Sequence, residues 1–390
     1  MKKSLIAVAV ASAFVAPAAM AEVTLSGAIN LGIEIAKSSP KSGSSLTRTL
    51  LNSNYSHVDI ESVDDIGGGN KVIFHYQLYA QPQNTGQTSA NPLNRNSYLG
   101  VAGGWGAFKM GTNENVYERM MYTADPLDGA LGPGGNLMIL GTPGAGTAFD
   151  AGQSACGKPQ IGGGCIGFYR RAEQEIWYES PNFSGLSFEV DYTLSAYKTT
   201  APNSVNPGII SLGGKFQPEG APFYVDLSYE QHKDMFGLTG IAASFGGAVV
   251  GTSSKDTGIQ IGAGYMIGDL GLHVRFETLK YKEDGVVGPV SEYKRNAEWI
   301  GVKYNLPSGY VGGEVGVAQK GKTNQASIDK SGATMFGVGS FHNLSKQSQL
   351  QFIYGRTGND DRATYTQAGA PLGAAGGTNQ VFHVGIKHTY

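Results

Sequence analysis

Eight charged residues have types and positions that would let them act together on charged or polar molecules. Five basic residues lie in or next to segments in which polar and apolar residues alternate: Lys71, Arg95, Lys109, Arg171 and Arg275. Three acidic residues lie in a long Gly-rich stretch without such alternation: Glu118, Asp125 and Asp128. Opposite charges on two sides of a narrow gap would create a transverse field that orients polar solutes. Alternatively, each of these charges is solvated or paired locally.

The histidines show no catalytic arrangement in the sequence. A hydrolase needs a nucleophile and a His presented together, with a third group that orients the base. No nucleophile motif surrounds any of the seven histidines: His57, His75, His232, His273, His342, His383 and His388. We therefore expect no enzyme, and we expect neither a cofactor nor a metal site.

The two cysteines, Cys156 and Cys165, are joined by a flexible stretch, Gly-Lys-Pro-Gln-Ile-Gly-Gly-Gly. Metal binding would require further soft ligands, and the sequence around them offers none. In an exported chain the environment favours oxidation. We therefore predict a disulfide between Cys156 and Cys165.

The N-terminus has the features of a cleaved secretory signal over residues 1–21. Lys2 and Lys3 precede an apolar run, and Ala19-Met20-Ala21 is a small-x-small cleavage site. The run is too short to be a comfortable membrane anchor. Without Lys2 and Lys3, 27 of the 29 basic residues remain against 31 acidic ones, a formal charge of −4. This mild balance argues against nucleic acid as a partner.

Residues 22–390 are dominated by segments of about ten alternating residues, separated by turn sequences. The first, Val23 to Glu34, places Val23, Leu25 and Ile29 on one face and Thr24 and Glu34 on the other. We count sixteen such segments, with short turns and longer connections in strict alternation. This layout predicts an all-β fold, a transmembrane antiparallel barrel of sixteen strands. A soluble sandwich is the alternative, but the small residues on the apolar faces would fill its core poorly.

One long connection, residues 113–170, stands apart from this pattern and contains both cysteines. Structureless loops longer than about 15 residues are uncommon in compact domains and are usually functional or disordered. It is the third of the long connections, and the others lie near 39–54, 82–94, 198–206, 232–255, 283–294, 321–331 and 357–377. We predict that it folds inward and forms the constriction.

The last strand ends the chain on an aromatic residue. Phe382, Val384, Ile386, His388 and Tyr390 share one face of NQVFHVGIKHTY. An alternating strand that ends in an aromatic residue resembles the signal read by the barrel-assembly machinery, with Phe382 and Tyr390 as its apolar elements.

Taken in order, several motifs resemble the general trimeric porins of Gram-negative outer membranes, in particular the neisserial-type group. They are VTLSGAINLGIE, DDIGGGNKVIFHYQ, NSYLGVAGGWGAFKMGTNEN, YESPNFSGLSFEVDY and the closing VGIKHTY. The resemblance covers essentially all of residues 22–390. It implies sixteen strands, a homotrimer, and a third outer loop folded into the lumen. It also implies a location in the bacterial outer membrane, among outer-membrane lipid and lipopolysaccharide.

A porin of this kind would form a water-filled channel for passive diffusion of ions and small hydrophilic solutes. Alternation also places Lys303 and Lys387 on the inner face, together with acids that include Asp191, Asp226, Glu230 and Glu277. By this count the inward acids outnumber the inward bases. We therefore expect weak or cation-leaning selectivity. A solute-specific channel and, less favoured, a barrel adhesin or surface structural protein are the alternatives.

The predicted disulfide has a measurable consequence. A Cys156–Cys165 bond would restrain the C-terminal part of the 113–170 connection. Reduction should therefore increase the current noise of the open channel in a planar bilayer without unfolding the barrel. Identical traces with and without reductant would count against this prediction.

Overall fold

A computed structural model describes most of the chain from Glu22 onward. The described residues are 22–80, 82–83, 94–127, 132–144, 167–196, 198, 206–238, 241, 253–286, 288–367 and 375–390. Three predicted site residues, Asp128, Cys156 and Cys165, lie outside these ranges, as does the predicted signal segment.

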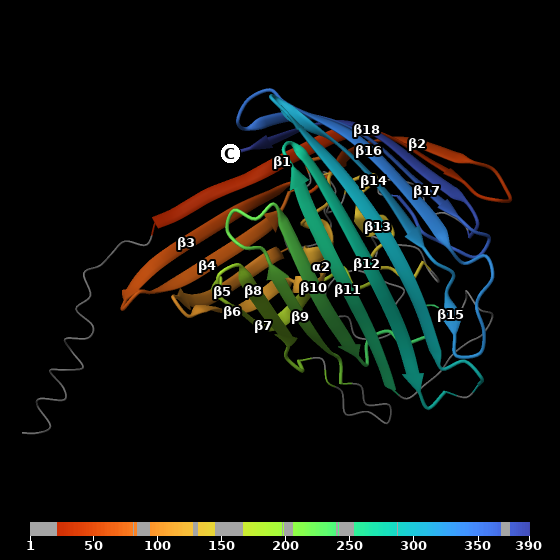
Figure 1. The fold of residues 1–390 in the computed structure, drawn as a ribbon, viewed down its shortest axis with the longest axis horizontal. Coiled ribbons are helices and arrows are strands. Elements are labelled where there is room, and N and C mark those ends of the chain that lie inside the picture. Colours follow the sequence, from red (N-terminus) through yellow and green to blue (C-terminus); the bar gives the residue numbers. More distant parts are fainter. Residues whose placement is uncertain are drawn as a thin grey trace, which may run out of the picture.

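The described strands form one continuous antiparallel sheet that closes on itself (Figure 1). The first strand, β1, pairs with the last, β18, from Ala28 opposite Thr389 to Ser39 opposite Thr378. Because first and last strands pair, the sheet is a closed barrel without a free edge. Its strands are β1 (Glu22–Ser39), β2 (Leu46–Ser53), β3 (His57–Gly67), β4 (Asn70–Tyr79), β5 (Asn94–Gly103), β6 (Gly106–Glu114), β7 (Arg171–Glu179), β8 (Leu186–Thr193), β9 (Gly208–Phe216), β10 (Phe223–Lys233), β11 (Ser253–Ile267), β12 (Leu270–Asp284), β13 (Glu292–Leu306), β14 (Gly309–Ala318), β15 (Lys322–Thr323), β16 (Ala333–Asn343), β17 (Ser348–Asn359) and β18 (Thr378–Thr389).

These segments make sixteen barrel strands, because two strands are interrupted. Segments β2 and β3 pair with successive halves of β1, and Tyr55 between them has a φ of 60°. Likewise β14 and β15 pair with successive parts of β13. The predicted sixteen-stranded barrel is confirmed. The predicted connection 39–54 is wrong in its extent, because β2 occupies Leu46–Ser53; the adjacent Leu50 and Leu51 break the alternation that reveals the other strands.

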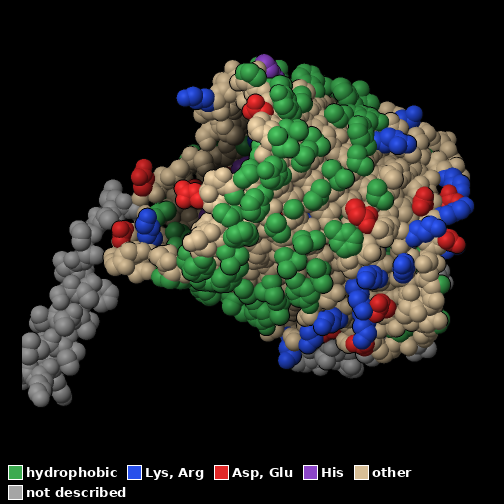
Figure 2. All heavy atoms as spheres, in the orientation of Figure 1, with side chains coloured by type: hydrophobic (Ala, Val, Ile, Leu, Met, Phe, Trp, Pro, Cys, Tyr) green, Lys and Arg blue, Asp and Glu red, His purple; other side chains and the backbone are tan. Residues whose placement is uncertain are grey.

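The outer face of the barrel is apolar, which is the reverse of a soluble protein. On β11, Ile259 and Ile261 are 49% and 50% exposed, whereas the intervening Gln260 is fully buried. Figure 2 shows apolar side chains gathered in a broad band across the strands. A continuous exposed apolar band around a closed sheet requires lipid around the barrel. This excludes the soluble sandwich that was the alternative from the sequence.

The two rims of the barrel differ. Short turns join strands at one rim, as at Gly67–Asn70, where Gly67, Gly68 and Gly69 all have positive φ values that favour glycine. At the other rim the connections are longer, and the longest joins β6 to β7. Since β6 ends at Glu114 and β7 begins at Arg171, this connection covers residues 115–170 and begins two residues after the predicted start at 113.

The β6–β7 connection contains helix α2 (Val116–Tyr122) and the 3-10 helix η1 (Asn136–Met138). Helix α2 contacts β8, β9 and β10, and Figure 1 shows it behind these strands. Among the described residues, no helix is both long and apolar enough to cross a membrane.

Candidate functional site

The β6–β7 connection packs against one side of the inner wall through an apolar cluster. From the connection come Tyr117, Met121, Ile139, Leu140 and Phe168, all fully buried. They meet wall residues of β12, β13, β14 and β16, which include Leu279, Tyr281, Tyr293, Trp299 and Met335. Because an inner wall in contact with water would be polar, this cluster marks where the connection is docked.

Acids of the wall hold the start of the connection. Asp191 Oδ2 accepts the Val116 backbone N–H at 2.7 Å, and Glu230 Oε2 accepts Asn115 Nδ2 at 2.9 Å. Both carboxylates therefore lie at the N-terminus of α2, where unpaired backbone N–H groups favour negative charge.

A second anchor centres on Glu277 of β12. Its carboxylate accepts the Gly141 backbone N–H at 2.8 Å and the Tyr117 hydroxyl at 3.0 Å. Arg295 Nη1 donates to Glu277 Oε1 at 2.7 Å, and its Nη2 donates to the Ile139 carbonyl at 3.0 Å. Both charged side chains are fully buried. A buried ion pair is tolerated when further hydrogen bonds satisfy its remaining donors and acceptors. Here the connection supplies those hydrogen bonds.

Glycines on the wall make room for the backbone of the connection. A Cβ at Gly312 would lie 2.4 Å from the Pro126 carbonyl oxygen, and one at Gly355 would lie 2.4 Å from the Gly134 nitrogen. A Cβ at Gly316 would meet the Ile139 side chain at 2.7 Å. These approaches are too close for any side chain, so glycine is required where the connection touches the wall.

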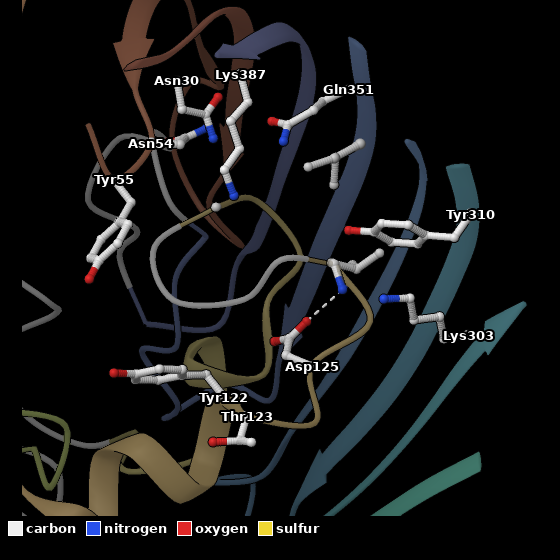
Figure 3. A pocket seen from close by; sticks show the side chains of 13 residues that line it. Asn30, Asn54, Tyr55, Tyr122, Thr123, Asp125, Lys303, Tyr310, Gln351 and Lys387 are labelled. Carbon is white, nitrogen blue, oxygen red and sulfur yellow. Dashed lines mark hydrogen bonds between the residues drawn. The ribbon is translucent and has the colours of Figure 1, made fainter. Parts of the chain in front are cut away.

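The docked connection leaves an opening between itself and the wall formed by β1, β13, β14, β17 and β18. A cavity of about 350 Å³ lies between the connection and the wall, and a second of about 270 Å³ continues it toward the rim of short turns. The two share Lys303, Tyr310 and Lys387. In Figure 3 the Lys303 and Lys387 side chains point into this space, with Asp125 of the connection nearby. The opening is lined by both signs of charge and by Tyr, Asn and Gln.

A cationic group lies beside the opening. Glu114 Oε1 accepts Arg95 Nη2 at 3.3 Å, and it also contacts Arg171. The Arg95 guanidinium lies 4.3 Å from the ring centre of Tyr55, which lines the cavity. Because two guanidinium groups share one carboxylate, the cluster of Arg95, Glu114 and Arg171 carries a net positive charge.

The other predicted site residues lie apart from the opening or in local pairs. Lys109 pairs with Glu179 at 2.6 Å, and Arg275 with Asp226 at 2.7 Å. Lys71 is exposed next to the short β3–β4 turn. Asp125 does line the opening, where it accepts the backbone N–H groups of Leu127 and Asn136. Lys303 and Lys387, which alternation places inward, were not among the residues predicted to act across the gap.

Glu118 lies on α2, within the connection, and its side chain is buried. Its Oε2 atom has no hydrogen-bond partner among the described residues. Burial raises the pKa of the Glu118 carboxyl from its ordinary value near 4.5 to about 8, and the neighbouring Glu114 charge adds to the rise. At neutral pH Glu118 is therefore mostly protonated and contributes little negative charge.

A closed barrel with an apolar outer face and a partly filled polar lumen defines a membrane channel. Residues 7–362 match the family model described as Gram-negative porin, and the chain belongs to that family. It is therefore an outer-membrane channel for passive diffusion of small hydrophilic solutes.

Known porins share both sequence and fold with the chain. Outer membrane porin protein 32 of Delftia acidovorans is 26% identical over all of both chains. Major outer membrane protein P.IB of Neisseria meningitidis serogroup A is 27% identical over 60% of this chain and 61% of its own. The solved structure titled "Anion-selective porin from Comamonas acidovorans" superposes with a TM-score of 0.73 at 22% identity, covering 95% of this chain and 100% of that one.

The glycines under the connection yield a prediction. Gly312→Val should force the Pro126 backbone away from β14 and into the opening, and should lower single-channel conductance. Overpacking of this kind costs about 1–3 kcal/mol. Gly313→Val is the matched control, because Gly313 is the next residue on β14 and its added Cβ would meet only ordinary contacts, the nearest at 3.7 Å. Equal conductance in the two variants would contradict the close approach.

Glu118 yields a prediction about pH. The docked state holds the Glu118 proton more tightly than the undocked state, so docking is strongest below pH 4.5 and weakens as pH rises toward about 8. Within that interval each pH unit lowers the docking equilibrium constant by about tenfold at most. Amide exchange of α2, corrected for intrinsic rates, should show this loss of protection. Glu118→Gln should remove most of the pH dependence; an unchanged profile in that variant would refute the assignment.

Proposed function

We propose that this porin prefers small anions, and that the preference arises at the opening beside the docked connection. The sequence alone favoured weak or cation-leaning selectivity because inward acids outnumber inward bases. That count treats every acid as facing water. The proposal is supported by the finding that several of those acids hold the β6–β7 connection against the wall.

Several acids that alternation placed on the inner face are occupied. Asp191, Glu230 and Glu277 accept hydrogen bonds from the β6–β7 connection, and Asp226 is paired with Arg275. All four are buried. None of these four carboxylates lines either cavity, and each already has a donor or a cation as a partner, so none is placed to bind a hydrated cation in the opening.

The bases at the opening are placed differently. Lys303 and Lys387 line both cavities, and the ammonium group of Lys303 lies 3.9 Å from the ring centre of Tyr310. The Arg95–Glu114–Arg171 group adds positive charge behind Tyr55. Asp125 is the opposing acid on the connection, so the field predicted across the gap runs from wall bases to this residue. The similar Comamonas acidovorans porin is itself titled anion-selective.

A further part of the proposal concerns how the porin assembles. We propose a homotrimer, as the resemblance implies; one solved porin-like neighbour, OmpT of Vibrio cholerae, is titled a trimer form. Phe382 and Tyr390 are both about half exposed on the outer face, 45% and 43%, which suits recognition by the barrel-assembly machinery. A strictly solute-specific channel, an adhesin and an enzyme remain the less supported functions.

Reversal potentials in a KCl gradient across a planar bilayer test the proposal. The wild-type channel should favour chloride, and K303Q/K387Q should lower the chloride-to-potassium permeability ratio roughly two- to fivefold, since a unit charge at about 4 Å contributes about 1 kcal/mol in water before screening. Lys233 on β10 and Lys255 on β11 are exposed and in phase with the lipid-facing residues of those strands. K233Q/K255Q therefore removes the same charge from the outer face and should leave the ratio unchanged. A potassium-selective wild type, or equal effects of the two double variants, would overturn the proposal.

A further inference from the structure

The barrel wall contains an extra residue beside the opening. Leu31 of β1 lies opposite Ser53 of β2, and Ala28 of β1 lies opposite His57 of β3. Two residues of β1 therefore face three residues of the neighbouring strand. This is the arrangement of a β-bulge, which bends a strand and re-aims a side chain. The residue at its centre, Tyr55, has a φ of 60°, a left-handed conformation that is uncommon for a bulky residue.

Hydrogen bonds of buried polar side chains hold the bulge in this shape. The Asn30 backbone N–H donates to Ser56 Oγ at 2.8 Å, and the Ser53 hydroxyl donates to the same oxygen at 2.7 Å. Asn54 Nδ2 donates to Glu34 Oε1 at 3.2 Å. All five of these residues are buried. Because its neighbours fix the backbone in a strained conformation, the direction of the central side chain is fixed as well.

The bulge directs the Tyr55 ring to the edge of the opening. Tyr55 lines the larger cavity together with Tyr122 of the β6–β7 connection. In Figure 3 these two tyrosines lie on one side of the space, and Tyr310 lies on the opposite side. The Tyr122 hydroxyl donates to Glu114, which fixes the second ring. The two tyrosines therefore form one side of the opening, where the wall meets the connection.

The cluster of Arg95, Glu114 and Arg171 lies behind the Tyr55 ring. The Arg95 guanidinium lies 4.3 Å from the ring centre of Tyr55 and 5.1 Å from that of Tyr79 on β4. The side chains of Arg95 and Glu114 are only 8% and 4% exposed, and neither residue lines either cavity. The Tyr55 ring therefore stands between the opening and the Arg95 charge.

We propose that Tyr55 is a specificity-determining residue of the channel, a fixed partition that limits the width of the opening and separates permeating solutes from the Arg95 guanidinium. Pore width is one of the properties that decide which solutes a channel passes. Removal of the ring would widen the opening toward Arg95 and bring that charge into contact with solutes. Because the ring excludes neutral solutes as well as ions, its role does not depend on which ion the channel prefers.

Liposome swelling with neutral sugars tests the effect of the ring on width. Tyr55→Gly removes the ring and suits a φ of 60°, so the bulge should be retained. In this variant the swelling rate with a disaccharide, relative to that with a monosaccharide, should rise at least about twofold. Tyr55→Phe keeps the ring and should behave like the wild type. Tyr79→Ala is the matched control, because Tyr79 also contacts Arg95 but lines neither cavity, and it should keep the wild-type ratio.

Reversal potentials in a KCl gradient test the separation from Arg95. The chloride-to-potassium permeability ratio of Tyr55→Gly should rise at least about twofold above that of the wild type, whichever ion the wild type prefers. In Tyr55→Gly/Arg95→Gln this rise should vanish, whereas the wider size limit should remain.

A wild-type value of either ratio in Tyr55→Gly would overturn the proposal, as would an equal change in Tyr55→Phe or Tyr79→Ala. A rise in the chloride ratio that persists without Arg95 would also contradict it. Heat-modifiable mobility on gels shows whether each variant folds. If Tyr55→Gly folds poorly, Tyr55→Asn provides the same test, because Asn tolerates a positive φ and lacks the ring.

Discussion

The Glu277–Arg295 pair is the interaction on which the shape of the channel depends. It lies fully buried on the inner wall, where water would otherwise fill the lumen. Its hydrogen bonds go to Gly141, Tyr117 and Ile139 of the β6–β7 connection. Breaking one half of a buried pair typically costs about 3–5 kcal/mol. The pair and the connection thus stabilise each other, and the opening is what their docking leaves free.

This arrangement gives the charges of the inner wall two different roles. Carboxylates on β8, β10 and β12 satisfy backbone and side-chain donors of the connection, and so they act as structural acceptors. Lysines on β13 and β18 have no place in that docking and line the opening instead. Glycines such as Gly312 and Gly355 have a third role, because they permit the close backbone contact that fixes where the connection lies on the wall.

The sequence predicted the barrel well because alternation with period two is a local property that survives closure. The alternation of Ile259, Gln260 and Ile261 predicts which of them face outward without any knowledge of the neighbouring strands. It missed β2, whose adjacent leucines disturb the pattern at the rim. It also placed Glu230 and Glu277 correctly on the inner face but could not tell that they are covered. Their partners, Asn115 and Gly141, are more than a hundred residues away, and no local pattern encodes such contacts.

The proposed anion preference requires that inner-wall acids are committed to docking while Lys303 and Lys387 meet the solutes. Anomalous diffraction from crystals soaked separately in bromide and in rubidium can locate the two kinds of ion. We expect bromide in the cavity beside Lys303 and Lys387, and no rubidium at Glu230 or Glu277. Rubidium at either carboxylate, with the cavity empty of bromide, would contradict this expectation.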